Sequence, residues 1–242
     1  MALTGLDIYK LLPKTNCKKC GRPTCLAFAM QLAQKKANLS DCPDVSEEAK
    51  KVLGAASAPP IKLVTVGAGA KKVEVGEENV LFRHEEKFYH PTGVAVTIYD
   101  DLSDADFNER LKRINSLKIS RVGTEIEIDL IAIINKSNNA QKFTEAAKKV
   151  SSGSHLSIIL SSASVENMKA ALSACAEKRP LIHGANSGNC ESMAALAKEK
   201  NCPMTVTAQT LEELADLTER AKKAGVEEIV LDVSGNNPKE VL

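Results

Sequence analysis

The chain contains an uninterrupted strand–helix–strand unit in residues 129–160, which read DLIAIINKSNNAQKFTEAAKKVSSGSHLSIIL. Its two apolar runs, Asp129–Ile134 and Leu156–Leu160, are nearly continuous rather than alternating, as is typical of parallel strands covered on both faces. Between them, Ala140–Val150 carries apolar residues at helical spacing, and Gly153 follows as a stop signal. The unit predicts an α/β fold with right-handed crossovers.

The same unit repeats outward in both directions along the chain. We expect six parallel strands, at Val94–Tyr99, Asp129–Ile134, Leu156–Leu160, Leu181–His183, Met204–Thr207 and Ile229–Val233. We expect helices between them, starting at Ser103, Ala140, Ser164, Glu191 and the capping box Thr210–Glu213. The repeat fits either a TIM-type (βα) barrel or an open doubly wound sheet.

Ahead of these strands we expect either a β-hairpin or an irregular entry segment, with Lys62–Val66 and Lys71–Val75 as its two arms. The glycines of Gly67–Gly69 between them are not followed by a helix, so we do not interpret them as a nucleotide-binding loop. Three aromatic residues further on are expected to close the floor of the barrel, namely Phe82, Phe88 and Tyr89.

The composition excludes several classes of protein. The 242 residues are 43% hydrophobic and 26% charged with a net charge of +1, which argues against a disordered chain. The near-zero charge and the 3% aromatic content argue against binding of nucleic acid. No apolar run is long enough to cross a bilayer, and the first fifteen residues lack the form of a signal peptide. We therefore expect a cytoplasmic protein with no membrane partner.

The first 60 residues differ in charge from the rest of the chain. They hold nine Lys or Arg and five Asp or Glu, a balance of +4, whereas the remainder has a balance of −3. Residues 54–60 are small and end in a proline pair, as is typical of a linker. We expect a small helical domain at residues 1–57, a linker at 58–62 and a barrel domain at 63–242.

Four of the seven cysteines lie in the small domain, at Cys17, Cys20, Cys25 and Cys42. A domain of this size often needs a covalent or metal cross-link, but nothing indicates the secretory route that disulfides require. Four-cysteine zinc sites usually use two close pairs, and sixteen residues separate Cys25 from Cys42. Three cysteines on one winding loop with a remote Cys-Pro suit the corners of an iron–sulfur cube. The spacing favours that cluster over zinc, and zinc over unliganded thiols.

Two groups of polar residues leave their interpretation open. Basic side chains around the first cysteines form either a solvated loop or a docking collar for an acidic redox partner; they are Lys14, Lys18, Lys19 and Arg22. Polar residues at strand ends either carry barrel chemistry or cap loops; they are Asp100, Asn135, Ser161, Asn186, Gln209 and Asp232. The sequence suggests no nucleophile–base pair among them, and the four histidines lack the spacing of metal ligands.

The segment Cys17–Cys25, CKKCGRPTC, with Asp41–Pro43 after it, resembles the [4Fe–4S] domain of the corrinoid/iron–sulfur proteins of the reductive acetyl-CoA (Wood–Ljungdahl) pathway. The opening Leu3–Pro13 and the stretch Leu81–His90 are similar to the large (gamma) subunits of that family, and the resemblance runs along the whole chain. The resemblance implies a small helical [4Fe–4S] domain that is followed by a TIM-type (βα) barrel. We expect this chain to contain part of that barrel. The resemblance also implies four ligands to the iron of the cluster, Cys17, Cys20, Cys25 and Cys42.

The resemblance further implies a role in cytoplasmic carbon fixation. Members of this family are heterodimers with a small subunit and carry a methyl group on the cobalt of a cobamide, a corrinoid cofactor. They accept the methyl group from methyltetrahydrofolate through a methyltransferase and deliver it to acetyl-CoA synthase. The cluster passes on the electron that returns Co(II) to Co(I), which it receives from a reductive activator or a ferredoxin-type donor. On this interpretation the protein is a methyl carrier rather than a stand-alone catalyst.

The resemblance also implies a C-terminal cobamide-binding domain, which this chain lacks, so no residue here is assigned to the cobamide. The sequence ends where Asn237-Pro238 would begin a helix, and we expect it to be the N-terminal part of a longer protein. The alternative function is a barrel enzyme with an accessory redox cluster, whose catalysis takes place at the carboxyl ends of the strands.

Overall fold

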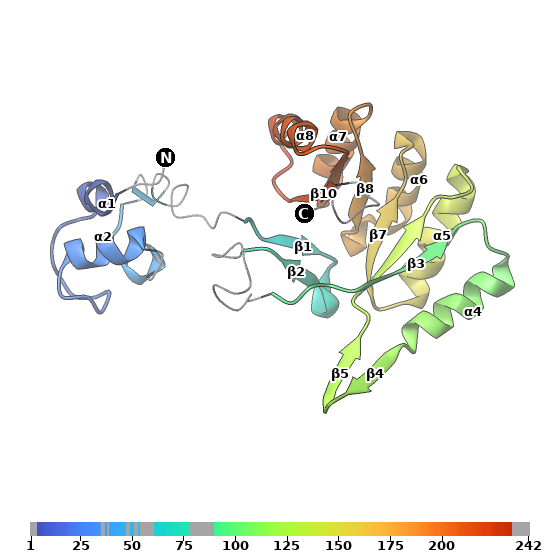
Figure 1. The fold of residues 1–242 in the computed structure, drawn as a ribbon, viewed down its shortest axis with the longest axis horizontal. Coiled ribbons are helices and arrows are strands. Elements are labelled where there is room, and N and C mark those ends of the chain that lie inside the picture. The colour runs from blue at the N-terminus through green and yellow to red at the C-terminus, as the bar shows by residue number, and fades with distance from the viewer. Residues whose placement is uncertain are drawn as a thin grey trace. The chain divides into compact units, whose positions relative to one another are not determined.

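The computed structural model describes residues 4–34, 37, 39–46, 49–50, 53, 61–77 and 90–233, drawn in Figure 1. These residues divide into two compact units, each with a hydrophobic core of its own. The first unit is the N-terminal part of the chain as far as Lys62, together with Glu77. The second unit contains Leu63–Gly76 and the chain from His90 onward.

The first unit contains helices α1 (Gly5–Leu11) and α2 (Cys25–Ala33) and the short 3-10 turn η1 (Leu39–Asp41). Threonines cap both helices: Thr4 Oγ1 accepts a hydrogen bond from the backbone of Asp7, and Thr24 Oγ1 accepts one from Ala27. Two of the four cysteines are among the buried side chains that form the core of this unit. The core residues are Ile8, Leu12, Cys25, Phe28, Ala29, Leu32, Cys42, Val45, Ala49 and Leu53. Much of the helix that the sequence predicts near residues 45–53 lies outside the described residues.

The second unit is built on a six-stranded parallel sheet. Its strands are β3 (Ala95–Tyr99), β6 (Leu130–Ile134), β7 (Ser157–Ser161), β8 (Leu181–Ala185), β9 (Met204–Ala208) and β10 (Ile229–Val233). The six predicted strands are therefore confirmed to within one or two residues. Each strand pairs with the next one along the chain, in the order β3-β6-β7-β8-β9-β10. A doubly wound sheet reverses its strand order at a switch point, so this fold is not doubly wound.

Five helices connect these strands and cover one face of the sheet (Figure 1). They are α4 (Asp104–Asn115), α5 (Ala140–Gly153), α6 (Val165–Cys175), α7 (Cys190–Lys200) and α8 (Leu211–Lys223). Their apolar faces share a single core with alternate strand residues such as Ile98, Ile131 and Ile158. The predicted starts at Ser103, Ser164 and Thr210 are confirmed, because each side-chain oxygen accepts a backbone hydrogen bond from the first turn. Closure of the sheet into a barrel is not seen among the described strands, where β3 and β10 are the edges.

The predicted hairpin is also confirmed, with β1 (Val64–Val66) pairing antiparallel to β2 (Val73–Val75). It packs on the other face of the sheet, near the amino ends of the strands, where its valines form a small core with Leu130 and Leu181. Ser157 Oγ donates hydrogen bonds to the carbonyls of Val66 at 3.2 Å and Lys71 at 2.8 Å. The hairpin thus lies at the end of the sheet where the sequence predicts a barrel floor. The three aromatic residues predicted to form that floor, Phe82, Phe88 and Tyr89, are outside the described part of the chain.

A glycine is required where the hairpin meets the sheet. Gly67 has a φ of +94°, and a Cβ on it would lie 2.0 Å from the Oγ of Ser157. Any side chain at this position would combine backbone strain with a steric clash against the strand β7.

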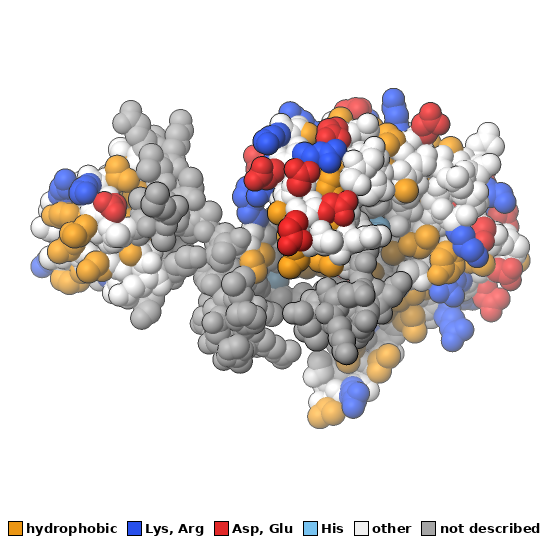
Figure 2. Space-filling view, turned by 45° about the horizontal axis from the view of Figure 1, so that its top comes forward, with side chains coloured by type: hydrophobic (Ala, Val, Ile, Leu, Met, Phe, Trp, Pro, Cys, Tyr) orange, Lys and Arg blue, Asp and Glu red, His pale blue; other side chains and the backbone are white. Residues whose placement is uncertain are grey.

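A second hairpin, which the sequence analysis did not predict, lies between α4 and β6. Its strands β4 (Lys118–Arg121) and β5 (Thr124–Glu127) are exposed along their whole length. It projects from the sheet in Figure 1, and Figure 2 shows hydrophobic and basic side chains on it. Val122 at its tip is 96% exposed and has a φ of +51°, followed by Gly123 at +77°. A two-residue turn with both φ angles positive normally carries Asn-Gly, because a β-branched side chain is strained there.

We expect Val122→Asn to stabilise this hairpin by up to about 1 kcal/mol, because asparagine tolerates the left-handed backbone that strains valine. The measurement is hydrogen exchange of the amides in β4 and β5, which should slow down. Val122→Thr is the control, since threonine is polar but still β-branched and should leave exchange unchanged. Equal slowing in both variants would show that removing an exposed apolar group, not relieving backbone strain, has the effect.

Within the described residues, no helix has the length and apolar character needed to cross a membrane.

Candidate functional site

The four N-terminal cysteines lie on the loop between α1 and α2 and directly after η1. Cys17 is exposed, Cys20 is half-buried, Cys25 is the first residue of α2 and is buried, and Cys42 is buried. Burial raises the pKa of the Cys42 thiol, and its three neighbours Cys20, Cys17 and Cys25 raise that pKa further. Two of the four cysteines are thus buried in the core of the first unit, and the other two lie nearer its surface.

The backbone of the cysteine loop winds through the left-handed region at every second residue. Lys14, Asn16 and Lys18 have φ angles of +58°, +50° and +61°, and Gly21 has +72°. The amide of Gly21 donates a hydrogen bond to the carbonyl of Lys18 at 2.9 Å. Left-handed residues at this spacing make the chain turn repeatedly between α1 and α2, and Gly21 is the residue type that adopts this backbone without strain.

Asn16 and Cys25 form a reciprocal pair of hydrogen bonds across this loop. The backbone N–H of Asn16 donates to the Sγ of Cys25 at 3.4 Å, and the backbone N–H of Cys25 donates to the Oδ1 of Asn16 at 2.8 Å. Cys25 is also the first residue of the nine-residue helix α2. The two hydrogen bonds therefore fix the position of Cys25 relative to the loop that carries Cys17.

An ion pair holds the other side of the loop. The Nζ of Lys19 lies 2.9 and 3.0 Å from the two carboxylate oxygens of Asp44, and the Sγ of Cys17 donates to Asp44 Oδ2 at 3.5 Å. The hydrogen bond from Lys19 lowers the pKa of Asp44 below its usual value, and the bond from Cys17 also lowers it. Of the predicted basic collar, Lys19 is thus bound within the loop, and Lys14 lies 5.6 Å from the ring centroid of Tyr9.

The donor set fits an anionic cluster in one further respect. The Nε of Arg22, between Cys20 and Cys25 in the chain, is buried and has no hydrogen-bond partner among the described residues. A buried donor of this kind is costly unless an acceptor reaches it, and an anionic group beside the loop would provide one. Among the described residues, which include all four of these cysteines, no three His, Cys, Asp or Glu side chains are placed so that they could hold a metal ion.

The three remaining cysteines, Cys175, Cys190 and Cys202, are buried in the second unit, where they pack as small hydrophobic residues. Burial raises the pKa of Cys175 to about 12 and that of Cys202 to about 11, and it also raises the pKa of Cys190. These thiols stay protonated at neutral pH and are poor ligands or nucleophiles.

Two of the predicted strand-end residues belong to a buried loop-building network. The carboxylate of Asp100 accepts hydrogen bonds from Asn135 Nδ2 at 2.7 Å and from the backbone and hydroxyl of Ser137 at 2.8 and 2.7 Å. Asn135 in turn accepts from Ser162 and Asn167. All the polar groups at this edge find partners within the network, so its role is structural. Asn186 and Gln209 make only local turn and capping contacts.

The other two strand-end residues, with a histidine, form a chain that the sequence analysis missed. Ser161 Oγ lies 3.0 Å from His183 Nδ1, and His183 Nε2 lies 3.3 Å from Asp232 Oδ2. No nucleophile–base pair stands out in the sequence, and the structure places these three side chains within hydrogen-bond distance of one another. Strand order and the two-residue alternation of side chains bring these residues together, and neither can be read from local sequence. They occupy the face opposite the helices, toward the carboxyl ends of β7, β8 and β10.

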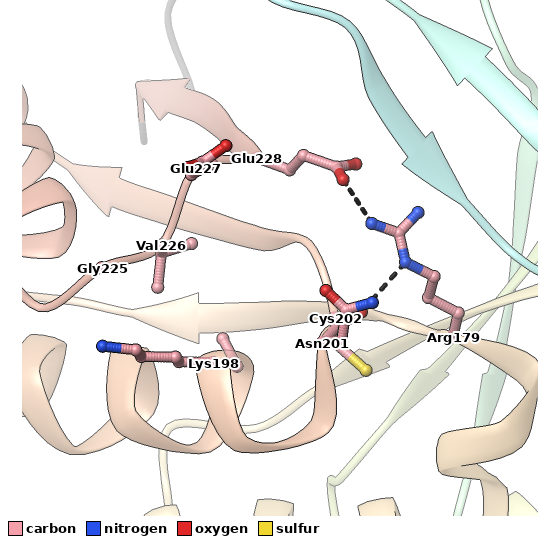
Figure 3. Close-up of a pocket in the computed structure, with 9 residues that line it drawn as sticks. Arg179, Lys198, Asn201, Cys202, Gly225, Val226, Glu227 and Glu228 are labelled. Atoms are coloured by element: carbon pink, nitrogen blue, oxygen red, sulfur yellow. Dashed lines mark hydrogen bonds and ion pairs between the residues drawn. The ribbon is translucent and has the colours of Figure 1, made fainter.

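At the opposite, amino end of the sheet a pocket surrounds Arg179, shown in Figure 3. The guanidinium donates to the carbonyl of Thr65 at 2.8 Å and to that of Asn201 at 2.9 Å, and it pairs with the carboxylate of Glu228. Glu228 also accepts from the backbone N–H of Thr65 at 2.7 Å. The pocket is thus organised around a clamp that ties β1 to the sheet, and its polar groups already serve the fold.

Comparison with known proteins agrees with the division into two units. A family model described as CO dehydrogenase/acetyl-CoA synthase delta subunit matches residues 63–238, and one described as "Putative Fe-S cluster" matches residues 12–43. The chain is 45% identical over 232 residues to the corrinoid/iron–sulfur protein large subunit of Moorella thermoacetica, covering 96% of this chain and 52% of that protein. It is 39% identical to the acetyl-CoA decarbonylase/synthase complex subunit gamma of Methanothermobacter thermautotrophicus, covering 96% of this chain and 51% of that protein.

The chain therefore spans about half the length of these curated relatives. The similarity extends through both units, and it confirms the resemblance to large (gamma) subunits drawn from the cysteine motif. We conclude that the chain belongs to the CO dehydrogenase/acetyl-CoA synthase delta subunit family.

Proposed function

We propose that this chain is the part of a corrinoid methyl carrier's large subunit that holds a [4Fe–4S] cluster, with Cys17, Cys20, Cys25 and Cys42 as its ligands. The observation that carries the proposal is the match of residues 12–43, which contain all four cysteines, to the family model described as "Putative Fe-S cluster". The spacing of three cysteines on one loop and a remote fourth supports a cube-shaped cluster over a single ion.

A cluster in this position supplies one-electron transfer, and the residues of the chain adapt the site to that task. Four thiolates provide the ligands, and the N–H of Asn16 compensates part of the negative charge on Cys25. Lys19 contributes a positive charge, balanced by Asp44, so that the loop is nearly neutral on that side. We propose that the electron restores the reduced cobalt of a cobamide that is bound outside this chain's described residues.

The partners follow from the same proposal. Relatives are named as the large subunit of a corrinoid/iron–sulfur protein and as gamma subunits of a decarbonylase/synthase complex. We therefore propose a small subunit as permanent partner. The proposed transient partners are a methyltransferase that supplies methyl from methyltetrahydrofolate, acetyl-CoA synthase as acceptor, and a reductive activator or ferredoxin-type donor.

The barrel is part of the proposal as well. The sequential strand order, with all five helices on one face, supports a TIM-type (βα) barrel of which these six strands are the first part. A small hairpin at the amino ends of the strands supports the same architecture, because it takes the position of a barrel floor.

One observation favours a second candidate function, a barrel enzyme with an accessory redox cluster. Ser161, His183 and Asp232 form their chain toward the carboxyl ends of the strands, where barrel enzymes place their catalytic groups. Turnover of a folate or another small molecule by this chain alone, lost in His183→Ala, would favour this function over methyl carriage.

The experiment that tests the proposed function is metal and sulfide analysis with visible absorption, after anaerobic purification and reconstitution of the whole chain. We expect about four iron and four sulfide per chain with absorption at the blue edge of the visible range. Zinc in place of iron, or a colourless protein with free thiols after reconstitution, would contradict it. With the complete subunit and its partner, cobalt should be found in the same sample.

A further inference from the structure

Asn16 contacts the proposed ligand Cys25 through both its backbone and its side chain. Its N–H reaches the Sγ of Cys25, and its Oδ1 accepts from the N–H of Cys25. The two residues are nine positions apart, and the two bonds close a ring between the start of the loop and the start of α2. Each bond restrains the geometry of the other.

The backbone angle of Asn16 suits this arrangement. Asparagine is among the few residues other than glycine that tolerate the left-handed region, and Asn16 has a φ of +50°. Lys14 and Lys18, two residues away on either side, adopt the same backbone conformation, yet no contact joins their side chains to a cysteine among the described residues. Lys14 and Lys18 therefore serve as internal comparisons for Asn16. They share its left-handed backbone but lack its pair of hydrogen bonds to Cys25.

The chemistry of a thiolate ligand gives the N–H···S bond a consequence for electron transfer. A donor that points at the sulfur withdraws negative charge from it and stabilises the reduced, more negative state of a cluster more than the oxidised state. The bond therefore raises the reduction potential. Its strength depends on how firmly the Asn16 amide is held opposite Cys25, which the Oδ1 contact controls.

We propose that Asn16 is a positioning residue that holds Cys25 for the cluster and raises the cluster's reduction potential through the N–H···S bond. This inference rests on the proposed function, in which Cys25 is a ligand. Asn16 touches the ligand rather than the reacting metal, so it acts through Cys25.

The test uses the whole reconstituted chain and three variants. Asn16→Gly keeps the backbone N–H and the left-handed angle but removes the acceptor Oδ1. Asn16→Asp keeps an acceptor of the same shape, and Lys14→Gly makes the matched backbone change at a position without the clamp. Two readouts apply: the rate of iron loss to a chelator, and the midpoint potential from a redox titration followed by visible absorption.

We expect Asn16→Gly to lose iron roughly fivefold faster, the factor that corresponds to one ordinary hydrogen bond. Its midpoint potential should shift in the negative direction, which a purely structural role would not produce. Asn16→Asp should retain iron at the unsubstituted rate; its added charge shifts the potential by itself, so it serves only the retention measurement. Lys14→Gly should match the unsubstituted chain in iron loss.

Several outcomes would overturn the inference while leaving the proposed function intact. They are an unchanged potential in Asn16→Gly, an equal effect in Lys14→Gly, and iron loss in Asn16→Asp as fast as in Asn16→Gly. If Asn16→Gly assembles no cluster, assembly in Asn16→Asp supports the inference and its absence there overturns it. An unsubstituted chain that takes up no iron would instead remove the proposed function, and the inference with it.

Discussion

Replacement of Cys25 by alanine is expected to lower the iron content of the reconstituted chain from about four atoms to fewer than about one, and to abolish its visible absorption. Alanine offers no ligand, and the position is buried at the start of α2, where water cannot easily take the place of the thiolate. The second unit should stay folded, because Cys25 belongs to the separate core of the first unit. Iron analysis and absorption measure the loss, and far-ultraviolet circular dichroism measures the fold.

Cys202→Ala is the matched control for this experiment. Cys202 is also buried, but it belongs to the core of the second unit, and its pKa of about 11 keeps it protonated. It should keep the full iron content and spectrum. Full iron in Cys25→Ala, or equal loss in both variants, would mean that the thiols of the first unit do not hold the cluster.

Replacement of Arg179 by methionine is expected to lower the free energy of unfolding of the second unit by about 2 kcal/mol. Methionine keeps an apolar stem but removes the hydrogen bonds to Thr65 and Asn201 and leaves the carboxylate of Glu228 without its cation. The side chains of Arg179 and Glu228 are only 22% and 29% exposed, so water screens the loss incompletely. Urea unfolding of the second unit, followed by circular dichroism, provides the measurement.

Arg220→Met serves as the control, because Arg220 forms a comparable contact with a more exposed partner. Its Nε lies 2.6 Å from Glu191, whose side chain is 61% exposed. Such surface pairs contribute less than about 1 kcal/mol, so this variant should unfold close to the unsubstituted chain. Equal destabilisation by the two substitutions would contradict the role of Arg179 in fastening β1 to the sheet.

Sequence periodicity predicted the parallel strands well because a strand covered on both faces needs a continuous apolar run, such as Leu130–Ile134. Helix starts were equally predictable, since Ser103 and Thr210 are caps whose effect is local. The β4–β5 hairpin was missed because its strands alternate weakly and its turn holds valine in place of the asparagine that marks such turns. Elements whose signals lie in the local sequence were thus predicted, whereas the hairpin with an atypical turn residue was not.

The candidate site shows the same division between local and long-range information. The cysteine spacing pointed to the loop between α1 and α2, and the family comparison agrees with that region. The Asn16–Cys25 clamp and the Ser161–His183–Asp232 chain depend on how distant segments meet, through backbone handedness in one and strand register in the other. No local residue pattern in these segments predicts the contacts.

The three alternating left-handed residues of the cysteine loop have an energetic consequence for ligand capture. Two of them are lysines, which gain nothing locally from this backbone, and each such residue costs about 1 kcal/mol or more. Folding of the first unit meets this cost. Under the proposed function, a cluster that binds a loop already ordered in this way does not have to order the chain, so more of its intrinsic bonding energy remains as affinity.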